Sequence, residues 1–233
     1  MKASLVQVAF YLILILVGLK QFKVMAVYSE RDIKDLPQRK RVNFINSLSG
    51  FKSANLLGTA NRDAQSNLAI ISSAIHLGAD PALLGYINRP ASVERHSLEN
   101  ILDVGFYTLN HVNTSIIDAA HQTSARYPKE ESEFAATGLD EQWHDGFDAP
   151  FVKQSLIQIG LRYAEHYTLL NNTVMVVGEI VLVAVPDEVI HEDGLVDIVQ
   201  CNSVAVSGLD TYHAPQKVKR LAYAKPDLPS REI

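Results

Sequence analysis

The sequence predicts a mainly β protein, an antiparallel barrel with a few helices packed outside it. Short apolar runs of strand composition recur between turn residues, and long helical patterns are few. Asn171-Asn172 is a typical two-residue hairpin turn, because asparagine tolerates positive φ, and a long apolar strand follows it. With 233 residues the chain can bury a sizeable core. We expect one domain over residues 25–233, preceded by an apolar extension over residues 1–24.

The strands expected in the first half are residues 56–61, 68–77, 82–87 and 105–112. Pro81 separates the second from the third, since proline cannot donate to a strand ladder. A helical pattern begins at Leu98, directly after the polar run 92–97.

A second helical segment has Ile116, Ile117 and Ala120 on one face, and we expect it to end near Tyr127-Pro128. A short acidic helix over residues 130–136 follows, closed by Gly138.

In the second half, residues 156–170 alternate in places as a strand does. Residues 173–185 form a long expected strand that Pro186 stops. Gly178 within it suggests a bulge or a close backbone approach. A further strand is expected over residues 195–199.

The N-terminus allows three interpretations. Residues 5–19 are almost entirely apolar, with Lys2 before them and Lys20 and Lys23 after. About 15 residues is short for a membrane-spanning helix and closer to the apolar core of a signal peptide. Met25 opens a segment typical of a cytoplasmic N-terminus, so the first 24 residues are alternatively an untranslated leader. We expect a cytoplasmic protein, with a membrane anchor through residues 5–19 as the alternative.

Composition excludes some classes of protein. The net charge is −5 without a basic block, which argues against a nucleic-acid partner. Cys201 is the single cysteine, so an intramolecular disulfide framework and a cysteine-based zinc cluster are both excluded. We expect its thiol to be buried and inert.

The polar run before Leu98 is a candidate anion site. It places Arg95, His96 and Ser97 at the start of a helix, where free N–H groups and the helix dipole favour negative charge. The hydroxyl pair Ser72-Ser73 lies on a neighbouring β segment. A phosphorylated ligand fits these residues, and so does an ordinary N-cap at Ser97 beside a solvated Arg95.

Several catalytic motifs are absent from the sequence. It contains neither G-x-G-x-x-G nor a P-loop, no G-x-S-x-G nucleophile elbow and no H-E-x-x-H zinc motif. We therefore expect no catalytic acid–base side chain and no metal site, with any chemistry carried by a bound cofactor.

Five stretches in order carry a resemblance to a known family. They are Ser66-Asn67 with Ser72-Ser73 and Asp80-Pro81, Arg95-His96-Ser97 with Asn100, Gly105 to Asn110, Thr123-Ser124 with Glu133 and Gly138, and Gly178-Glu179-Ile180. Together they resemble the FMN-binding domain of the flavin reductase family, over residues 42–223. The resemblance implies a split β-barrel of Greek-key type that forms a homodimer, with FMN near the subunit interface.

The family resemblance also implies an activity and a set of binding residues. NADH or NADPH would pass a hydride to FMN, which then reduces free flavin, a metal or another acceptor. By position, Asn67, Ser72 and Ser73 would line the isoalloxazine and ribityl edge. The phosphate would be held by Arg95, His96 and Ser97, with Arg89 near it. Thr123 and Ser124 match a stretch that approaches the flavin.

This chain departs from the family at two places. Many members carry a basic residue, Asp and Thr where this chain has Arg95, His96 and Ser97. Between Ser73 and Asp80, residues 74–77 replace the aromatic or Val-Ser residues that members often have. His96 fits both a neutral hydrogen-bond donor and a charged phosphate ligand.

The function expected from the sequence is that of an FMN-dependent NAD(P)H:flavin oxidoreductase, with an unidentified electron acceptor. Two alternatives remain open at this stage. One is a non-catalytic FMN protein that acts as an electron carrier or sensor. The other is a related barrel that binds a different phosphorylated cofactor, such as pyridoxal phosphate.

Overall fold

The structure, a computed structural model, describes residues 25–90, 96–128 and 130–233. It divides into two compact units, one ending at Val42 and one running from Asn43 to Ile233. The expected N-terminal extension, with its apolar segment 5–19, lies outside the described residues. Within the described ranges, no helix is both long and apolar enough to cross a membrane.

The first unit contains α2 (Glu30–Asp35) and the start of α3 (Gln38–Leu48). Ser29 caps α2: its side chain accepts from the Asp32 backbone N–H, and the Asp32 carboxylate accepts from the Ser29 N–H at 2.8 Å. Two orphan donors at the helix start are thereby satisfied.

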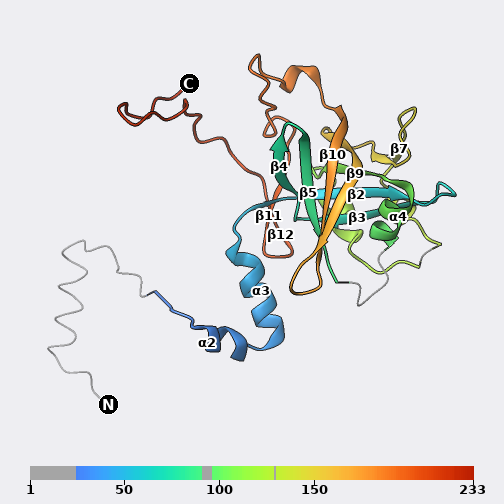
Figure 1. The fold of residues 1–233 in the computed structure, drawn as a ribbon, viewed down its shortest axis with the longest axis horizontal. Helices are drawn as coiled ribbons and strands as arrows, with labels where there is room; N and C mark the ends of the chain where they lie inside the picture. The colour runs from blue at the N-terminus through green and yellow to red at the C-terminus, as the bar shows by residue number, and fades with distance from the viewer. Residues whose placement is uncertain (1–24, 91–95, 129) are drawn as a thin grey trace. The chain divides into compact units, whose positions relative to one another are not determined.

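The second unit is built on a seven-stranded antiparallel sheet with the order β3-β2-β6-β9-β10-β5-β4 (Figure 1). Its strands are β2 (Asn55–Ala60), β3 (Ser66–Ile71), β4 (Ile75–Ala79), β5 (Ala82–Asn88), β6 (Phe106–His111), β9 (Gln158–Thr168) and β10 (Val174–Ala184). In Figure 1, β2 and β3 cross β5 and β10, as the strands of a barrel do. The expected mainly β antiparallel barrel is confirmed.

Smaller elements surround this sheet. Two short sheets comprise β1 (Lys52–Ser53), β11 (Ala205–Ser207) and β12 (Thr211–His213), and β7 (Glu141–Gln142) with β8 (Phe151–Val152). The helices are α4 (His96–Val104), α5 (Ile117–Gln122), α6 (Glu133–Thr137) and a 3₁₀ turn at Asp187–Val189.

The connection between β3 and β4 closes the barrel. The sequence predicted one strand over residues 68–77, which is wrong, because the chain changes pairing partner at Ser72-Ser73. β3 pairs with β2 as far as Ile71, and β4 pairs with β5 from Ile75. Ser73 Oγ donates to the Ile87 carbonyl and accepts from the Ile87 N–H, both at 3.1 Å. One hydroxyl thus ties the connection between the two edge strands to β5.

Two further element predictions are corrected. No strand forms over residues 195–199, where Val196 makes only an isolated bridge with Ile190. The Asp197 carboxylate accepts from the backbone N–H groups of Val199 and Gln200, which folds the segment into a turn. Helix α5 ends at Gln122 rather than near Tyr127, since the Thr123 hydroxyl donates to the Ala120 carbonyl at 2.8 Å and caps it.

Predictions about backbone geometry are confirmed at three positions. Asn172 adopts a φ of 62° in the β9–β10 turn, and Gly138 adopts 73° after α6. At Gly178 the β9–β10 register shifts, and a Cβ there would collide with the hydroxyl of Tyr107. Glycine is required at this position because Tyr107 fills the space.

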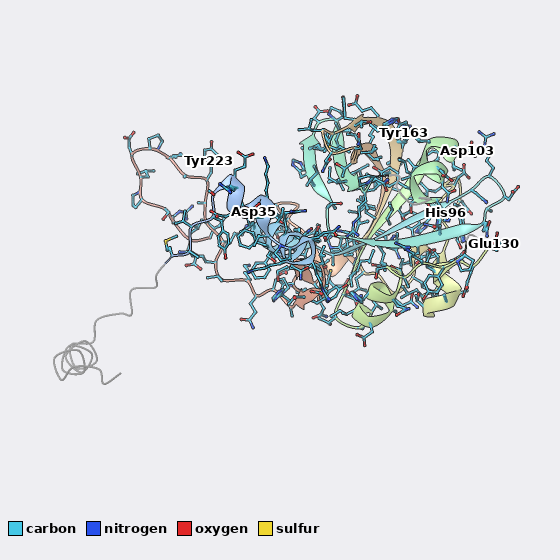
Figure 2. The ribbon with its side chains drawn as sticks, turned by 90° about the horizontal axis from the view of Figure 1, so that it is seen from below. Asp35, His96, Asp103, Glu130, Tyr163 and Tyr223 are labelled. Carbon is cyan, nitrogen blue, oxygen red and sulfur yellow. The ribbon has the colours of Figure 1, made fainter. Side chains whose placement is uncertain are left out.

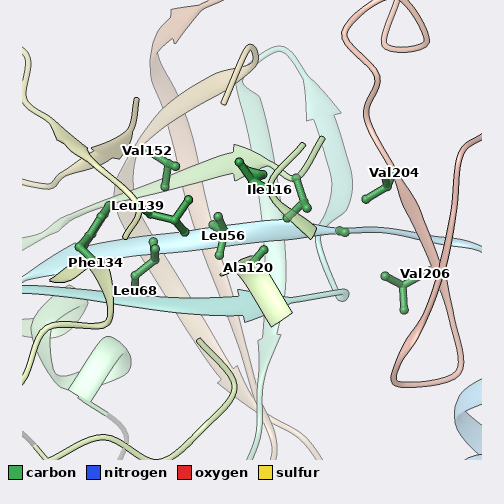
Figure 3. Packing of buried hydrophobic residues seen from close by; sticks show 11 residues of the cluster. Leu56, Leu68, Ile116, Ala120, Phe134, Leu139, Val152, Val204 and Val206 are labelled. Atoms are coloured by element: carbon green, nitrogen blue, oxygen red, sulfur yellow. The ribbon is translucent and has the colours of Figure 1, made fainter. Parts of the chain in front are cut away.

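Two apolar cores lie on opposite faces of β2, whose six residues are all buried. Leu57 belongs to the core inside the barrel, together with Tyr86 and Tyr107. Leu56 belongs to the outer core, where α5, α6 and β11 cover β2 and β3 (Figure 3). This arrangement explains why residues 54–60 lack the apolar–polar alternation of a strand with one exposed face.

Strand β3 is at one edge of the sheet, so its outward backbone N–H groups have no neighbouring strand. Two side chains replace that strand. Glu133 Oε2 accepts from the Leu68 N–H at 2.9 Å, and Thr123 Oγ1 accepts from the Ile70 N–H at 2.9 Å. The segment that carries α5 and α6 is therefore fixed to the barrel by polar contacts as well as by the outer core.

Replacing Thr123 with valine should destabilise the protein. The substitution keeps the shape but leaves the Ile70 N–H and the Ala120 carbonyl without their partner, a loss of about 1–3 kcal/mol. Urea unfolding followed by circular dichroism measures the effect. Thr123→Ser, which keeps the hydroxyl, is the matched control and should stay within about 1 kcal/mol of the wild type. Equal stability of the two variants would contradict this role of Thr123.

Candidate functional site

Helix α4 is held against β2 and β3 by two side-chain hydrogen bonds. Asn67 Nδ2 on β3 donates to Ser97 Oγ at 2.9 Å, and Asn100 Nδ2 donates to Thr59 Oγ1 on β2 at 3.2 Å. Ile101, fully buried, inserts from the same helix into the barrel core. The structure thus brings together Asn67 and Ser97, two of the predicted site residues.

A narrow pocket, which we call the α4 pocket, lies at this junction. It is lined by Asn61, Gln65, Ser66, Asn67, His96, Asn100, Pro128, Glu131 and Glu133. Its volume of about 20 Å³ has room for one water or one phosphoryl oxygen. Nδ1 of His96, the first residue of α4, is buried there, and it has no hydrogen-bond partner within the described part of the chain. A buried polar atom without a partner is costly, so this nitrogen needs a partner that a water or a ligand oxygen in the pocket can supply.

The α4 pocket also carries negative charge. Burial raises the pKa of the Glu133 carboxyl, while its hydrogen bond from the Leu68 N–H and the nearby His96 act in the opposite direction. Glu131 adds a second carboxylate and raises the pKa of Glu133 further. An anion bound here therefore needs positive charge from the start of α4.

Ser72 and Ser73 lie at the other end of β3, in the β3–β4 connection. The Ser73 hydroxyl is fully used in its two bonds to Ile87. The half-buried Ser72 makes no side-chain hydrogen bond to any residue that the structure describes. Ser72 is therefore the hydroxyl of this pair that is available to a ligand.

Arg89 is the predicted arginine that lies within the described residues. Arg95 lies outside the described residues. Arg89 is exposed after the end of β5 and does not line the α4 pocket. Its charge acts on Lys52, whose pKa is lowered first by burial and second by Arg89.

Thr123 and Ser124 follow α5. The buried Thr123 hydroxyl is occupied by the Ile70 N–H and the Ala120 carbonyl, and Ser124 is exposed. In the described structure, Thr123 supports the edge of β3 rather than offering its hydroxyl to a ligand.

Sequence reasoning missed several residues of the α4 pocket. Asn100 and Glu133 were part of the family pattern but were not assigned to the site, and Asn61 appeared only as the last residue of an expected strand. The spacing of His96 and Asn100, four positions apart on a helix, could have identified the second, because such residues share a face. Nothing in the sequence shows that the helix carrying Glu133 reaches β3.

Replacing Glu133 with glutamine should change how stability depends on pH. Because burial raises the Glu133 pKa above 4.5, the folded state holds this proton more tightly than the unfolded state. The wild type therefore loses stability as the pH rises from about 4 toward neutral, and Glu133→Gln, which can still accept from Leu68, lacks that loss. Urea unfolding at several pH values measures it, with the exposed Glu130→Gln as control. Identical pH profiles for wild type and Glu133→Gln would contradict the prediction.

Comparisons with known proteins identify the family. Residues 48–200 match the model of the flavin reductase like domain. A protein of Shewanella frigidimarina, assigned as a flavin reductase with a split barrel domain, is 51% identical in sequence with a TM-score of 0.83. That match covers 86% of this chain and 100% of the other.

More distant structures share the fold. Component B of nitrilotriacetate monooxygenase from Bacillus cereus has a TM-score of 0.75 at 16% identity, over 85% of this chain and 99% of the other. The NADH:FAD oxidoreductase of Streptomyces globisporus has a TM-score of 0.62 at 9% identity, over 83% and 99%. The resemblance found in the sequence is confirmed, and the chain belongs to the flavin reductase like family, with a split β-barrel fold.

Proposed function

We propose that this protein is an NAD(P)H-dependent flavin reductase that binds FMN along β3. The observation that carries the proposal is the buried, unpartnered His96 Nδ1 at the start of α4, beside the Asn67–Ser97 hydrogen bond. A phosphoryl oxygen in the α4 pocket would give this nitrogen the partner that the described residues do not supply. Membership in the flavin reductase like family supports a flavin as the bearer of that phosphate.

The residues along β3 suit the rest of an FMN molecule. From Asn67 to Ser72 the strand spans about 17 Å, the scale of a ribityl chain plus an isoalloxazine ring. Ile71, half-buried and on the same face of β3 as Asn67, offers apolar surface near the ring end. Ser72, whose hydroxyl bonds no described residue, is available to the polar edge of the ring. When bound, FMN supplies the hydride chemistry by accepting a hydride from a nicotinamide at N5.

The protein's part in the reaction is then binding and orientation. Hydride transfer depends on placing the nicotinamide about 3–3.5 Å from the flavin, rather than on an acid or base. Because Glu131 and Glu133 line the α4 pocket, the charge of Arg95 and a hydrogen bond from His96 would decide whether a phosphate stays there. The Streptomyces neighbour, an NADH:FAD oxidoreductase, supports a nicotinamide as electron donor.

A homodimer is part of the proposal. Strand β4 is an edge strand with Ile75 and Leu77 exposed, and Val181 and Val183 on β10 are also exposed. An edge strand with exposed apolar side chains is a liability that a second copy of the chain would cover.

We expect sedimentation equilibrium to give twice the chain mass of 25.8 kDa. Leu77→Lys should shift the population toward the monomer, because a charge would be buried at the interface. Leu170→Lys, at the fully exposed end of the β9–β10 hairpin, is the control. A monomeric wild type at micromolar concentration would refute the dimer.

The direct test of the proposed function is oxidation of NADH or NADPH by the purified protein with added FMN, followed at 340 nm. We expect turnover with at least one donor, and His96→Ala should weaken FMN binding by about 1.5–3 kcal/mol, the scale of a charge-assisted hydrogen bond. Asp103→Ala, at the other end of α4, is the control and should bind FMN like the wild type.

Bound FMN without oxidation of either nucleotide would refute the reductase and leave a non-catalytic flavoprotein. Unchanged FMN affinity in His96→Ala would remove His96 from the phosphate site. An absorbance spectrum of the native protein with a pyridoxal band instead of flavin bands would refute FMN itself.

A further inference from the structure

A second hollow, which we call the Trp143 groove, adjoins the α4 pocket. It is lined by Ala60, Asn61, Arg62, Ala64, Val104, Trp143 and Asp148. These residues come from the β2–β3 turn, the end of α4 and the segment between β7 and β8. Its volume of about 350 Å³ falls within the range of about 300–1,000 Å³ typical of small-molecule sites. The groove is therefore large enough for a nucleotide-sized group, whereas the α4 pocket has room for a single phosphoryl oxygen.

Trp143 gives the groove an aromatic wall. Its side chain is 42% exposed, although large aromatic side chains usually bury their area. The indole Nε1 donates to Glu141 Oε2 at 3.0 Å, which uses its only polar group and limits the orientation of the ring. What remains is the π-face of the indole, on which a flat heteroaromatic base can stack.

Arg62 is the cation among the residues that line the groove, which also include the Asp148 carboxylate. Its guanidinium pairs with Asp103 Oδ1 at 2.5 Å and is still 74% exposed. An arginine has five N–H donors, so this ion pair leaves donors free for a phosphate. An aromatic wall and an arginine in one groove suit a ligand with a base at one end and a phosphate at the other.

Two connections link the Trp143 groove to the α4 pocket. Asn61 lines both of them. Glu141 also joins them, since it accepts from Ser66 of the α4 pocket with Oε1 and from Trp143 with Oε2. On α4, Asn100 lines the α4 pocket and Val104 lines the Trp143 groove. These two residues are four positions apart, which is one helical turn or about 6 Å along the helix axis. Figure 2 shows His96 and Asp103, which mark the two ends of this helix. One diphosphate linkage can span this separation.

We propose that the Trp143 groove binds the adenosine 5′-phosphate half of a dinucleotide cofactor, with the adenine on Trp143 and its phosphate at Arg62. The inference rests on the proposed function, in which the α4 pocket receives an oxygen of the flavin's own phosphate. Because the pocket and the groove are continuous, a single FAD molecule can reach both of them. FAD therefore supplies the adenosine 5′-phosphate half, and the protein binds FAD more tightly than FMN. The adenosine half of NADH has the same chemistry and is distinguished by the test.

The test uses the intrinsic fluorescence of the full-length protein, since Trp143 is the single tryptophan of the chain. Titration with AMP should change the emission and saturate. Dissociation constants for FAD and FMN, measured by equilibrium dialysis, should differ in the wild type. Trp143→Ala should weaken FAD binding about tenfold and leave FMN binding within about twofold. Trp143→Phe should retain most of the FAD affinity, and Tyr223→Ala, an exposed aromatic outside the groove, is the control.

Each outcome has a defined meaning. If Trp143→Ala raises KM for NADH without changing FAD binding, the groove binds adenosine phosphate from the electron donor, and the assignment to FAD is overturned. If AMP leaves the fluorescence unchanged and the variant binds both flavins and NADH like the wild type, the adenosine site is refuted. If neither FMN nor FAD binds the wild type, the proposed function fails. The AMP titration tests the adenosine site independently of that result.

Discussion

The unpaired edge of β3 is the constraint on which the rest of the structure depends. A strand in that position exposes a row of backbone donors, and here Glu133 and Thr123 accept from Leu68 and Ile70. Those two acceptors place the α5–α6 segment, and with it one wall of the α4 pocket. At the far end of the strand, the Ser73 hydroxyl ties the chain to β5 and closes the barrel.

The same strand explains the chemistry proposed for the site. Its end near Asn67 meets the start of α4, where a buried His96 nitrogen that no described residue contacts by a hydrogen bond suits a phosphate. Its other end offers the apolar side chain of Ile71 and the hydroxyl of Ser72, which bonds no described residue, and both suit a ring. The carboxylates of Glu131 and Glu133 limit what binds at the phosphate end, because they repel an anion that the cations do not offset. Under the proposed function, the two ends of β3 position the cofactor that carries the chemistry.

Local chemistry made much of this predictable from the sequence. Asn172 and Gly138 indicated a turn and a helix end, because few residues tolerate positive φ. Gly178 indicated the bulge, because other residues do not tolerate so close an approach. The family pattern also singled out Asn67 and Ser97, which contact each other in the structure. The break at Ser72-Ser73 was not predictable, since the apolar run continues while the pairing partner changes. Long-range contacts such as Glu133 to Leu68 leave no local signal, and for that reason Thr123 was assigned to the ligand rather than to the strand edge.

A crystal structure of the protein with FMN tests the central claim most directly, namely that β3 seats the flavin with its phosphate at the start of α4. The account predicts phosphate density within hydrogen-bonding distance of His96 and Ser97, with the ring toward Ser72. Phosphate density at the other end of the sheet, beside Lys52 and Arg89, would reverse the ligand along β3 and contradict the account.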